Sequence, residues 1–140
     1  MKKLNLIITL LCISLLSYAE VHTVDNRPGS GAQFTTIHSA MAAAINGDTL
    51  LIHPSSASYG NINVTKGLVF IGPGHHPEFT GGMGAKINIV SIRNGSSNSK
   101  FIGLILDRIE CYVWAASNDV EIRNNYFYNH QVIKGAFGDN

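Results

Sequence analysis

The densest group of side chains able to do chemistry is Asp107-Arg108-Ile109-Glu110, in which two carboxyl groups flank a guanidinium. A pair of carboxyl groups can cleave a glycosidic bond by hydrolysis. Elimination on an acidic sugar instead needs a base and a cation that stabilises the developing negative charge. A repeat offset of 20 residues aligns Glu110 with His130 and Arg108 with Tyr128. We therefore take Asp107, Arg108, Glu110 and His130 as candidate catalytic residues, the alternative being a solvated turn with a weak ion pair.

Aromatic rings near these residues offer stacking faces for sugars, and Tyr112 and Tyr128 are the candidate substrate-binding residues. Tyr126 and Trp114 are further aromatic candidates, and Trp114 fits a buried core position equally well. His75-His76 and Glu78 resemble metal ligands, but adjacent histidines in a Gly/Pro-rich loop lack the spacing of zinc sites. The sequence predicts no metal site and no cofactor, although a polysaccharide lyase would call for Ca²⁺ held by acidic oxygens.

The first nineteen residues have the pattern of a secretory signal peptide, with cleavage after Ala19. Lys2 and Lys3 precede an apolar run from Leu4 to Leu16, and small residues stand at the cleavage positions. A membrane anchor is the alternative, but spanning takes about 20 residues and this run is shorter. The sequence predicts a secreted protein (extracellular, periplasmic or at the cell surface) of bacterial type, with no membrane contact after cleavage.

Net charge excludes a partner that is bound through a strong electrostatic field. The chain has ten basic and nine acidic side chains, and loss of Lys2 and Lys3 leaves a net charge of −1. No basic field exists to attract nucleic acid.

Only Cys111 remains after cleavage, so no disulfide can form within the mature chain, and a small buried apolar role fits this residue best.

Hydrophobic periodicity predicts one helix followed by short strands. Apolar residues at steps of three and four predict a helix over residues 36–46, with a threonine N-cap and Gly47 beyond its end. Val21 to Gln33 looks irregular and rich in turns. Alternating or continuous apolar runs predict strands over residues 49–53, 61–64, 68–71, 86–89, 100–106, 110–114 and 119–122.

Short strands recur along the chain. Residues 98–102 match residues 118–122 at an offset of 20, and residues 69–72 match 100–103 at an offset of 31. A period near twenty with a variable loop is typical of a coiled repeat array. A β-sandwich, the alternative, also has short strands and frequent turns but does not require this recurrence.

The stretch FTTIHSAMAAAINGDTLLIHPSSASYGNINVTKGLVFIGPG resembles the N-terminal opening of right-handed parallel β-helix proteins of the pectin-lyase-like superfamily. SNDVEIRNNYFYN resembles one of that family's repeats. The resemblance implies an all-β fold, a right-handed parallel β-helix solenoid with an N-terminal capping α-helix. From Asp48 to Asn140 we expect an incomplete solenoid of about four rungs, so that residues 20–140 form the N-terminal part of a longer domain.

Two functions remain open at this point. The first is a secreted carbohydrate-active enzyme, a polysaccharide lyase or glycoside hydrolase, whose catalytic rungs lie beyond the end of this chain. The second is a non-enzymatic cell-surface or adhesin-like protein that binds glycans or is structural. The expected partner in both cases is an extracellular polysaccharide or a cell-surface glycan.

Overall fold

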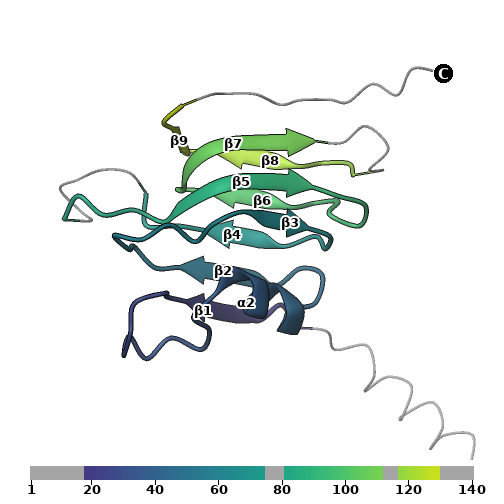
Figure 1. Ribbon diagram of the computed structural model, residues 1–140. Helices are drawn as coiled ribbons and strands as arrows, with labels where there is room; N and C mark the ends of the chain where they lie inside the picture. Colours follow the sequence, from purple (N-terminus) through teal and green to yellow (C-terminus); the bar gives the residue numbers. More distant parts are fainter. Residues whose placement is uncertain (1–17, 75–80, 112–116, 130–140) are drawn as a thin grey trace, which may run out of the picture.

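Residues 18–74, 81–111 and 117–129 are described by the computed structural model, and they form two small parallel sheets and one short helix (Figure 1). The elements in chain order are β1 (Val21–Val24), α2 (Ile37–Ala43), β2 (Thr49–Ile52), β3 (Ile62–Val64), β4 (Val69–Ile71), β5 (Lys86–Ile92), β6 (Lys100–Ile102), β7 (Ile105–Cys111), β8 (Glu121–Arg123) and β9 (Tyr126–Phe127).

From β2 onward, consecutive strands alternate between the two sheets. The first sheet has the order β1-β2-β4-β6-β8 and the second has the order β3-β5-β7-β9. Every pairing within these sheets is parallel. From β2 onward, each strand therefore lies beside a strand that is separated from it along the chain by a crossing to the other sheet and back, whereas β1 and β2 are joined through α2.

The predicted all-β, right-handed parallel β-helix solenoid of about four rungs is wrong. The structure shows two separate parallel sheets of five and four strands and a helix, and not a closed solenoid. Among the described residues, the segments that join the sheets add only one isolated bridge, an antiparallel one between Ser55 and Gly84. The prediction failed because apolar alternation reports which side chains point inward, and does not specify how many sheets share the core.

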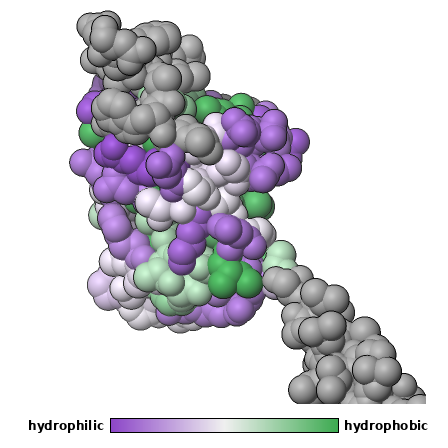
Figure 2. All heavy atoms as spheres, turned by 90° about the vertical axis from the view of Figure 1, so that its right-hand side faces the viewer, coloured by the Kyte–Doolittle hydropathy of each residue, from purple (hydrophilic) through white to green (hydrophobic). Residues whose placement is uncertain are grey.

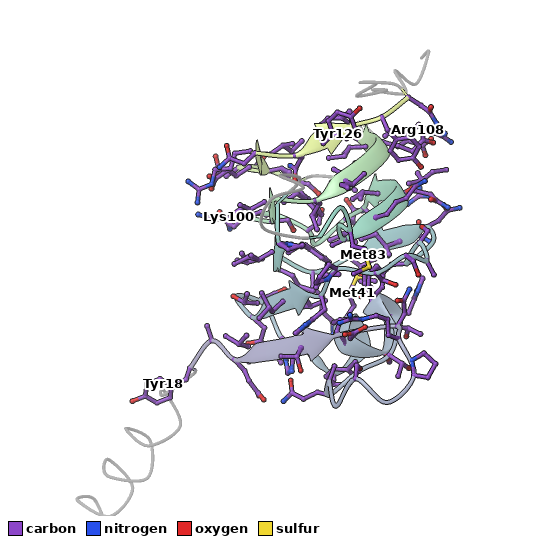
Figure 3. All side chains as sticks on the ribbon, turned by 90° about the vertical axis from the view of Figure 1, so that its left-hand side faces the viewer. Tyr18, Met41, Met83, Lys100, Arg108 and Tyr126 are labelled. Carbon is purple, nitrogen blue, oxygen red and sulfur yellow. The ribbon has the colours of Figure 1, made fainter. Side chains whose placement is uncertain are left out.

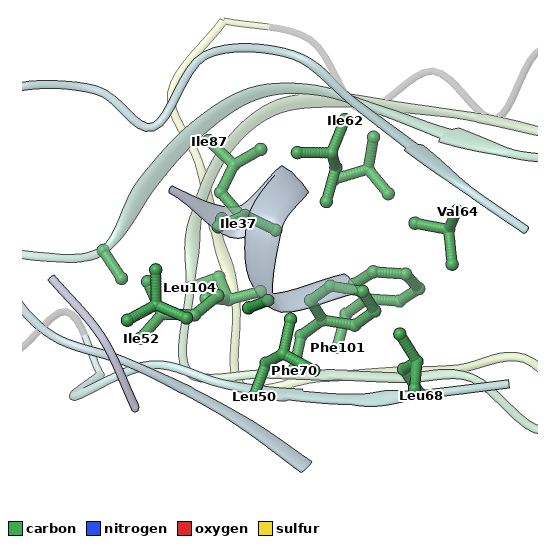
Figure 4. Packing of buried hydrophobic residues seen from close by; sticks show 14 of the residues in the cluster. Ile37, Leu50, Ile52, Ile62, Val64, Leu68, Phe70, Ile87, Phe101 and Leu104 are labelled. Carbon is green, nitrogen blue, oxygen red and sulfur yellow. The ribbon is translucent and has the colours of Figure 1, made fainter. Parts of the chain in front are cut away.

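The core lies between the two sheets, and equivalent inward side chains stack across neighbouring strands (Figure 4). Phe70 of β4 and Phe101 of β6 are paired in register, and their rings stack at 4.9 Å with planes 10° apart. The offset of 31 residues read from the sequence is the register of this pair. Both rings are fully buried, which for large aromatic side chains is a major source of folding free energy.

One predicted strand, residues 100–106, is two strands that belong to different sheets. Gly103 has φ +67° and ends β6, and β7 starts at Ile105 in the other sheet. The backbone carbonyl of Gly103 also approaches Gly72 so closely that a Cβ on Gly72 would lie 2.4 Å from its oxygen. A glycine inside an apolar run marks a turn between the sheets here, since glycine adopts positive φ without strain.

Helix α2 covers the end of the core that β1 and β2 border. It is shorter than predicted and is capped by Thr36, whose hydroxyl accepts a hydrogen bond from Ser39 N. Ile37, Ala40 and Ala44 are fully buried against the sheets. The chain then turns at Gly47, whose φ of +95° is the left-handed conformation predicted for this position.

Strand β1 was predicted as irregular chain, and that prediction was wrong. Val21–Val24 pairs along its length with β2, and His22 and Val24 point inward. Four residues with a histidine at an inward position carry little alternation signal, so the strand is recognisable only through its distant partner. Its outer edge is covered, because Gln33 Oε1 accepts from Thr23 N and Phe34 N donates to Thr23 O.

The surface is mainly polar on the side shown in Figure 2, where hydrophobic atoms form only small separate areas. Within the part of the chain that the structure describes, no helix has the length and apolar character needed to cross a bilayer.

We predict that Lys66→Met destabilises the helix-covered end. Lys66 Nζ donates to the carbonyls of Met41 and Ala44 at 2.8 and 2.6 Å, where the helix leaves backbone oxygens without intrahelical partners. Loss of hydrogen bonds from a charged group should lower the free energy of unfolding by about 1.5–3 kcal/mol, measured by urea denaturation.

Lys100→Met is the matched control for this prediction. Lys100 forms an ion pair with Glu121 at 3.0 Å on the surface of the first sheet. A surface ion pair contributes little, so this variant should change stability much less. Equal destabilisation by the two variants would contradict the capping role of Lys66.

Candidate functional site

Strands β5 and β7 each have two consecutive residues between their buried positions, on the outer side of the second sheet. In β7, Leu106 and Ile109 are buried, and Asp107 and Arg108 lie between them with partly exposed side chains. Because two residues instead of one separate the inward positions, the strict alternation of a strand is interrupted. In β5, the pair Asn88 and Ile89 has the equivalent place between the buried Ile87 and Val90.

We call the outward residues of these strands the polar face. Its members on β3, β5, β7 and β9, with the tyrosine that follows β9, are Asn63, Lys86, Asn88, Ser91, Asp107, Arg108, Glu110, Tyr126 and Tyr128. Arg108 and Tyr126 lie toward the β7–β9 end of the molecule, and Lys100 of the first sheet lies on the opposite side from Arg108 (Figure 3).

The polar face holds three of the four predicted catalytic residues in direct contact. Arg108 Nε donates to Glu110 Oε1 at 2.7 Å, and Arg108 Nη1 donates to Asp107 Oδ2 at 3.3 Å. Ser91, the register partner of Glu110 on β5, donates to Glu110 Oε2 at 3.5 Å. The two carboxylates therefore share one guanidinium, and Glu110 is also held by the neighbouring strand.

This arrangement suits binding better than cleavage. A carboxylate engaged with a guanidinium is a hydrogen-bond acceptor without a proton to give. The general acid of a glycosidase must hold a proton, and its partner must be free to attack or to activate water. Asp107, Arg108 and Glu110, which we call the trio, instead offer charged acceptors and donors in a fixed geometry. Hydroxyl groups of a ligand can form hydrogen bonds with both.

The predicted substrate-binding residue Tyr128 lies beside the trio. Its backbone N donates to Leu106 O, and its hydroxyl donates to Asn88 Oδ1 at 3.5 Å. Lys86 Nζ lies 4.2 Å from the centroid of the Tyr128 ring, so a cation already covers one ring face. Tyr126, half exposed on β9 and paired with Ile105, is the aromatic ring with more surface available.

The predicted alignment of Arg108 with Tyr128 and of Glu110 with His130 is off by one residue for the described pair. Strands β7 and β9 pair Leu106 with Phe127, an offset of 21, which brings Tyr128 into line with Asp107. The same offset of 21 holds in the other sheet, where β6 and β8 pair Lys100 with Glu121. The positive-φ residues Asn98 and Asp119, which precede these strands, are also 21 residues apart, so the true repeat is one residue longer than the offset of 20 that the sequence suggested.

Several predicted residues lie outside the described parts of the chain. They are His75, His76, Glu78, Tyr112, Trp114 and His130. Among residues 18–74, 81–111 and 117–129, no group of three or more His, Cys, Asp or Glu side chains is placed to hold a metal ion. The Ca²⁺ expected for a lyase therefore stays a prediction.

A second polar cluster, which sequence reasoning missed, lies where β1 and β2 end. Asp25 is buried, and Arg27 binds its carboxylate through Nη2 at 2.6 Å and through Nε at 3.0 Å. His53 Nδ1 lies 4.0 Å from Asp25, beyond hydrogen-bonding distance, and Tyr59 donates to His53 O. The only signal in the sequence was the spacing of Asp25 and Arg27, which is common in turns. The cluster fastens the loop after β1 to the sheet.

Comparison of this chain with models of protein families, with curated proteins and with solved structures found no match. The resemblance to the pectin-lyase-like superfamily therefore stays a prediction, and the site is interpreted from its own geometry.

We predict that Asp25 makes the fold sensitive to acid. The hydrogen bond from the Arg27 side chain holds the pKa of Asp25 below its ordinary value of 3.8, against the opposing effect of burial. A group whose pKa is lower in the folded state contributes stability that is present above its unfolded pKa. This contribution is lost as the pH falls below about 4 through the folded pKa.

Asp25→Asn should therefore be less stable than the wild type at pH 7, and the two should converge toward pH 2. Denaturant unfolding across this range measures the difference. Asp119→Asn, on an exposed turn residue, is the control and should follow the wild type. An unchanged difference between Asp25→Asn and the wild type from pH 7 to pH 2 would contradict the prediction.

Proposed function

We propose that the polar face binds a hydroxyl-rich extracellular polysaccharide, and that the described part of the chain is a binding protein and not the cleaving centre of an enzyme. The observation that carries this proposal is the Asp107–Arg108–Glu110 trio, fixed by Ser91 on the outer side of one sheet with two tyrosines beside it.

The chemistry of the polar face matches a sugar chain. Sugar hydroxyls both donate and accept, and the face mixes carboxylate acceptors with guanidinium, amide and hydroxyl donors. Tyr126 supplies a half-exposed ring on which the apolar side of a sugar can pack. With strands about 4.8 Å apart, four strands span about 15 Å, which exceeds a single sugar ring and favours an oligosaccharide.

Charge also favours a ligand recognised through hydroxyl groups. The face carries Lys86 and Arg108 against Asp107 and Glu110, so its cations and anions balance. A polyanion would gain nothing from the overall charge of the mature chain. The signal-peptide pattern supports a location outside the cytoplasm, where such polysaccharides occur.

The proposal predicts that the purified chain binds soluble polysaccharides, measured by affinity electrophoresis and titration calorimetry with neutral and acidic glycans. Arg108→Gln should weaken binding about tenfold or more, because the ordered acceptors lose the donor that fixes them. Tyr126→Ala removes an exposed ring without touching the core and should weaken binding as well.

Arg123→Gln is the matched control. Arg123 donates at 3.0 Å to Glu121, two residues before it on the first sheet, much as Arg108 donates to Glu110, two residues after it on the second. This variant should bind as the wild type does. Equal loss of affinity in Arg108→Gln and Arg123→Gln would show that the polar face is not the binding surface.

The same preparations distinguish binding from catalysis. Incubation with pectin and alginate, with and without a chelator, should yield no unsaturated uronate products and no new reducing ends. Release of either product by the wild type, and its loss in Arg108→Gln, would replace the binding proposal by an enzymatic one.

A further inference from the structure

The buried carboxylate of Asp48 gathers three donors from separate parts of the chain. Ile45 N donates to Oδ2 at 2.8 Å, Glu20 N donates to Oδ1 at 2.9 Å, and His22 Nε2 lies 3.2 Å from Oδ2. The Asp48 side chain is only 4% exposed. Burial by itself would raise the pKa of Asp48, but these donors outweigh it and lower the pKa below its ordinary value.

One of these donors is the nitrogen of the residue that follows the predicted signal-peptide cleavage point. Cleavage after Ala19 would make Glu20 the first residue, and its nitrogen would become the α-amino group. The position of Glu20 is fixed from its other side too, because Glu20 O accepts from Thr49 N at 2.8 Å. The new terminus would therefore stay beside Asp48.

Tyr18 and Ala19, the described residues before Glu20, belong to no helix or strand. Tyr18 is 76% exposed and lies away from the body of the molecule in Figure 3, and Ala19 is exposed and outside any strand or helix. Loss of Tyr18 and Ala19 therefore removes no buried side chain. The contact of the folded state that it changes is the one between Glu20 N and Asp48.

We propose that Asp48 is the binding site for the processed N-terminus, and that removal of residues 1–19 converts a backbone hydrogen bond into a buried ion pair that locks β1 onto β2. Water adds across the Ala19–Glu20 peptide bond, leaving a carboxylate on Ala19 and an ammonium on Glu20. The bond in the precursor already has an ionised acceptor. Processing adds a positive charge to the donor, so that the Coulomb attraction of a full ion pair is gained at a site with little water. The processed chain is thus more stable than its precursor, which favours folding after export.

Among residues 18–74, 81–111 and 117–129, three ionisable groups lie around this terminus. They are the carboxylate of Asp48, the imidazole of His22 and the side chain of Glu20, whose Oε1 lies 3.9 Å from His22 Nδ1. The carboxylates of Asp48 and Glu20 favour a positive charge at the terminus. The His22 imidazole contacts Asp48 Oδ2, whereas Glu20 N bonds to Oδ1.

The test compares three forms of the chain that differ only at the N-terminus. One begins with a free Glu20, one begins at Tyr18, and one begins with Glu20 acetylated on its nitrogen. At pH 6 the free Glu20 form should have an unfolding equilibrium constant about tenfold smaller than the other two. A difference of this size is what a hydrogen bond to a charged group contributes. This advantage should disappear as the pH rises through about 8–10, where an α-amino group loses its proton.

Asp48→Asn and Asp25→Asn provide the matched pair of variants. Asp48→Asn should equalise the three forms, whereas Asp25→Asn, at the other buried aspartate, should keep their difference, as a double-mutant cycle measures. Since acetylation leaves every side chain intact, the comparison stays informative even if Asp48→Asn does not fold. Equal stability of the free and acetylated forms at pH 6 would overturn the proposal.

This inference rests on the secretion that the proposed function also assumes, but the two fail separately. Mass spectrometry of the exported protein should find Glu20 as the first residue, and another N-terminus would overturn the inference without affecting polysaccharide binding. Absence of binding to any glycan would remove the proposed function and leave the stability differences at the N-terminus unchanged.

Discussion

In-register parallel pairing is the constraint on which the rest of the structure depends. It places equivalent residues of distant strands above one another, so that Leu50, Phe70, Phe101 and Ile122 form one column in the first sheet. The same pairing fixes the outer side of each strand. Ser91 therefore meets Glu110 because Val90 and Ile109 are aligned in the core, and a shift of one residue would turn every side chain to the wrong face.

Local chemistry was predictable from the sequence wherever it depends on one residue. Asn124 adopts φ +54° at a bend, as expected for an asparagine at such a position. Gly47 behaves in the same way. A preference for positive φ is a property of the residue itself and needs no distant partner.

Assignments that depend on distant partners were less predictable. The run from Lys100 to Leu106 reads as one strand, but Gly103 divides it between two sheets. Strand β1 is short and forms only against β2. The predicted parallel β-helix solenoid was wrong for the same reason, because the number of sheets is set by how the connections pack and not by the period of the apolar residues.

The candidate site was found from charge density and a repeat offset, and the binding role that we propose for it rests on the geometry of its contacts. Sequence spacing brought Asp107, Arg108 and Glu110 together correctly, but it could not show that both carboxylates take the same guanidinium. It also misplaced Tyr128 by one position, because residue matching gave an offset of 20, whereas the strands of both sheets pair with an offset of 21. Which atoms are already engaged decides whether such a trio binds or cleaves, and that information is three-dimensional.

Polar contacts dominate the end of the molecule formed by β1 and α2, and there is a physical reason for this. A strand at the border of a sheet and the last turn of a helix expose backbone groups that no further strand or turn can satisfy. Side chains replace these partners: Gln33 bonds to Thr23, Lys66 to the helix carbonyls, and Asp48 to two backbone nitrogens. One of those nitrogens belongs to Glu20. The aspartate that satisfies the backbone at this end of the molecule is therefore also the group that contacts the N-terminal nitrogen.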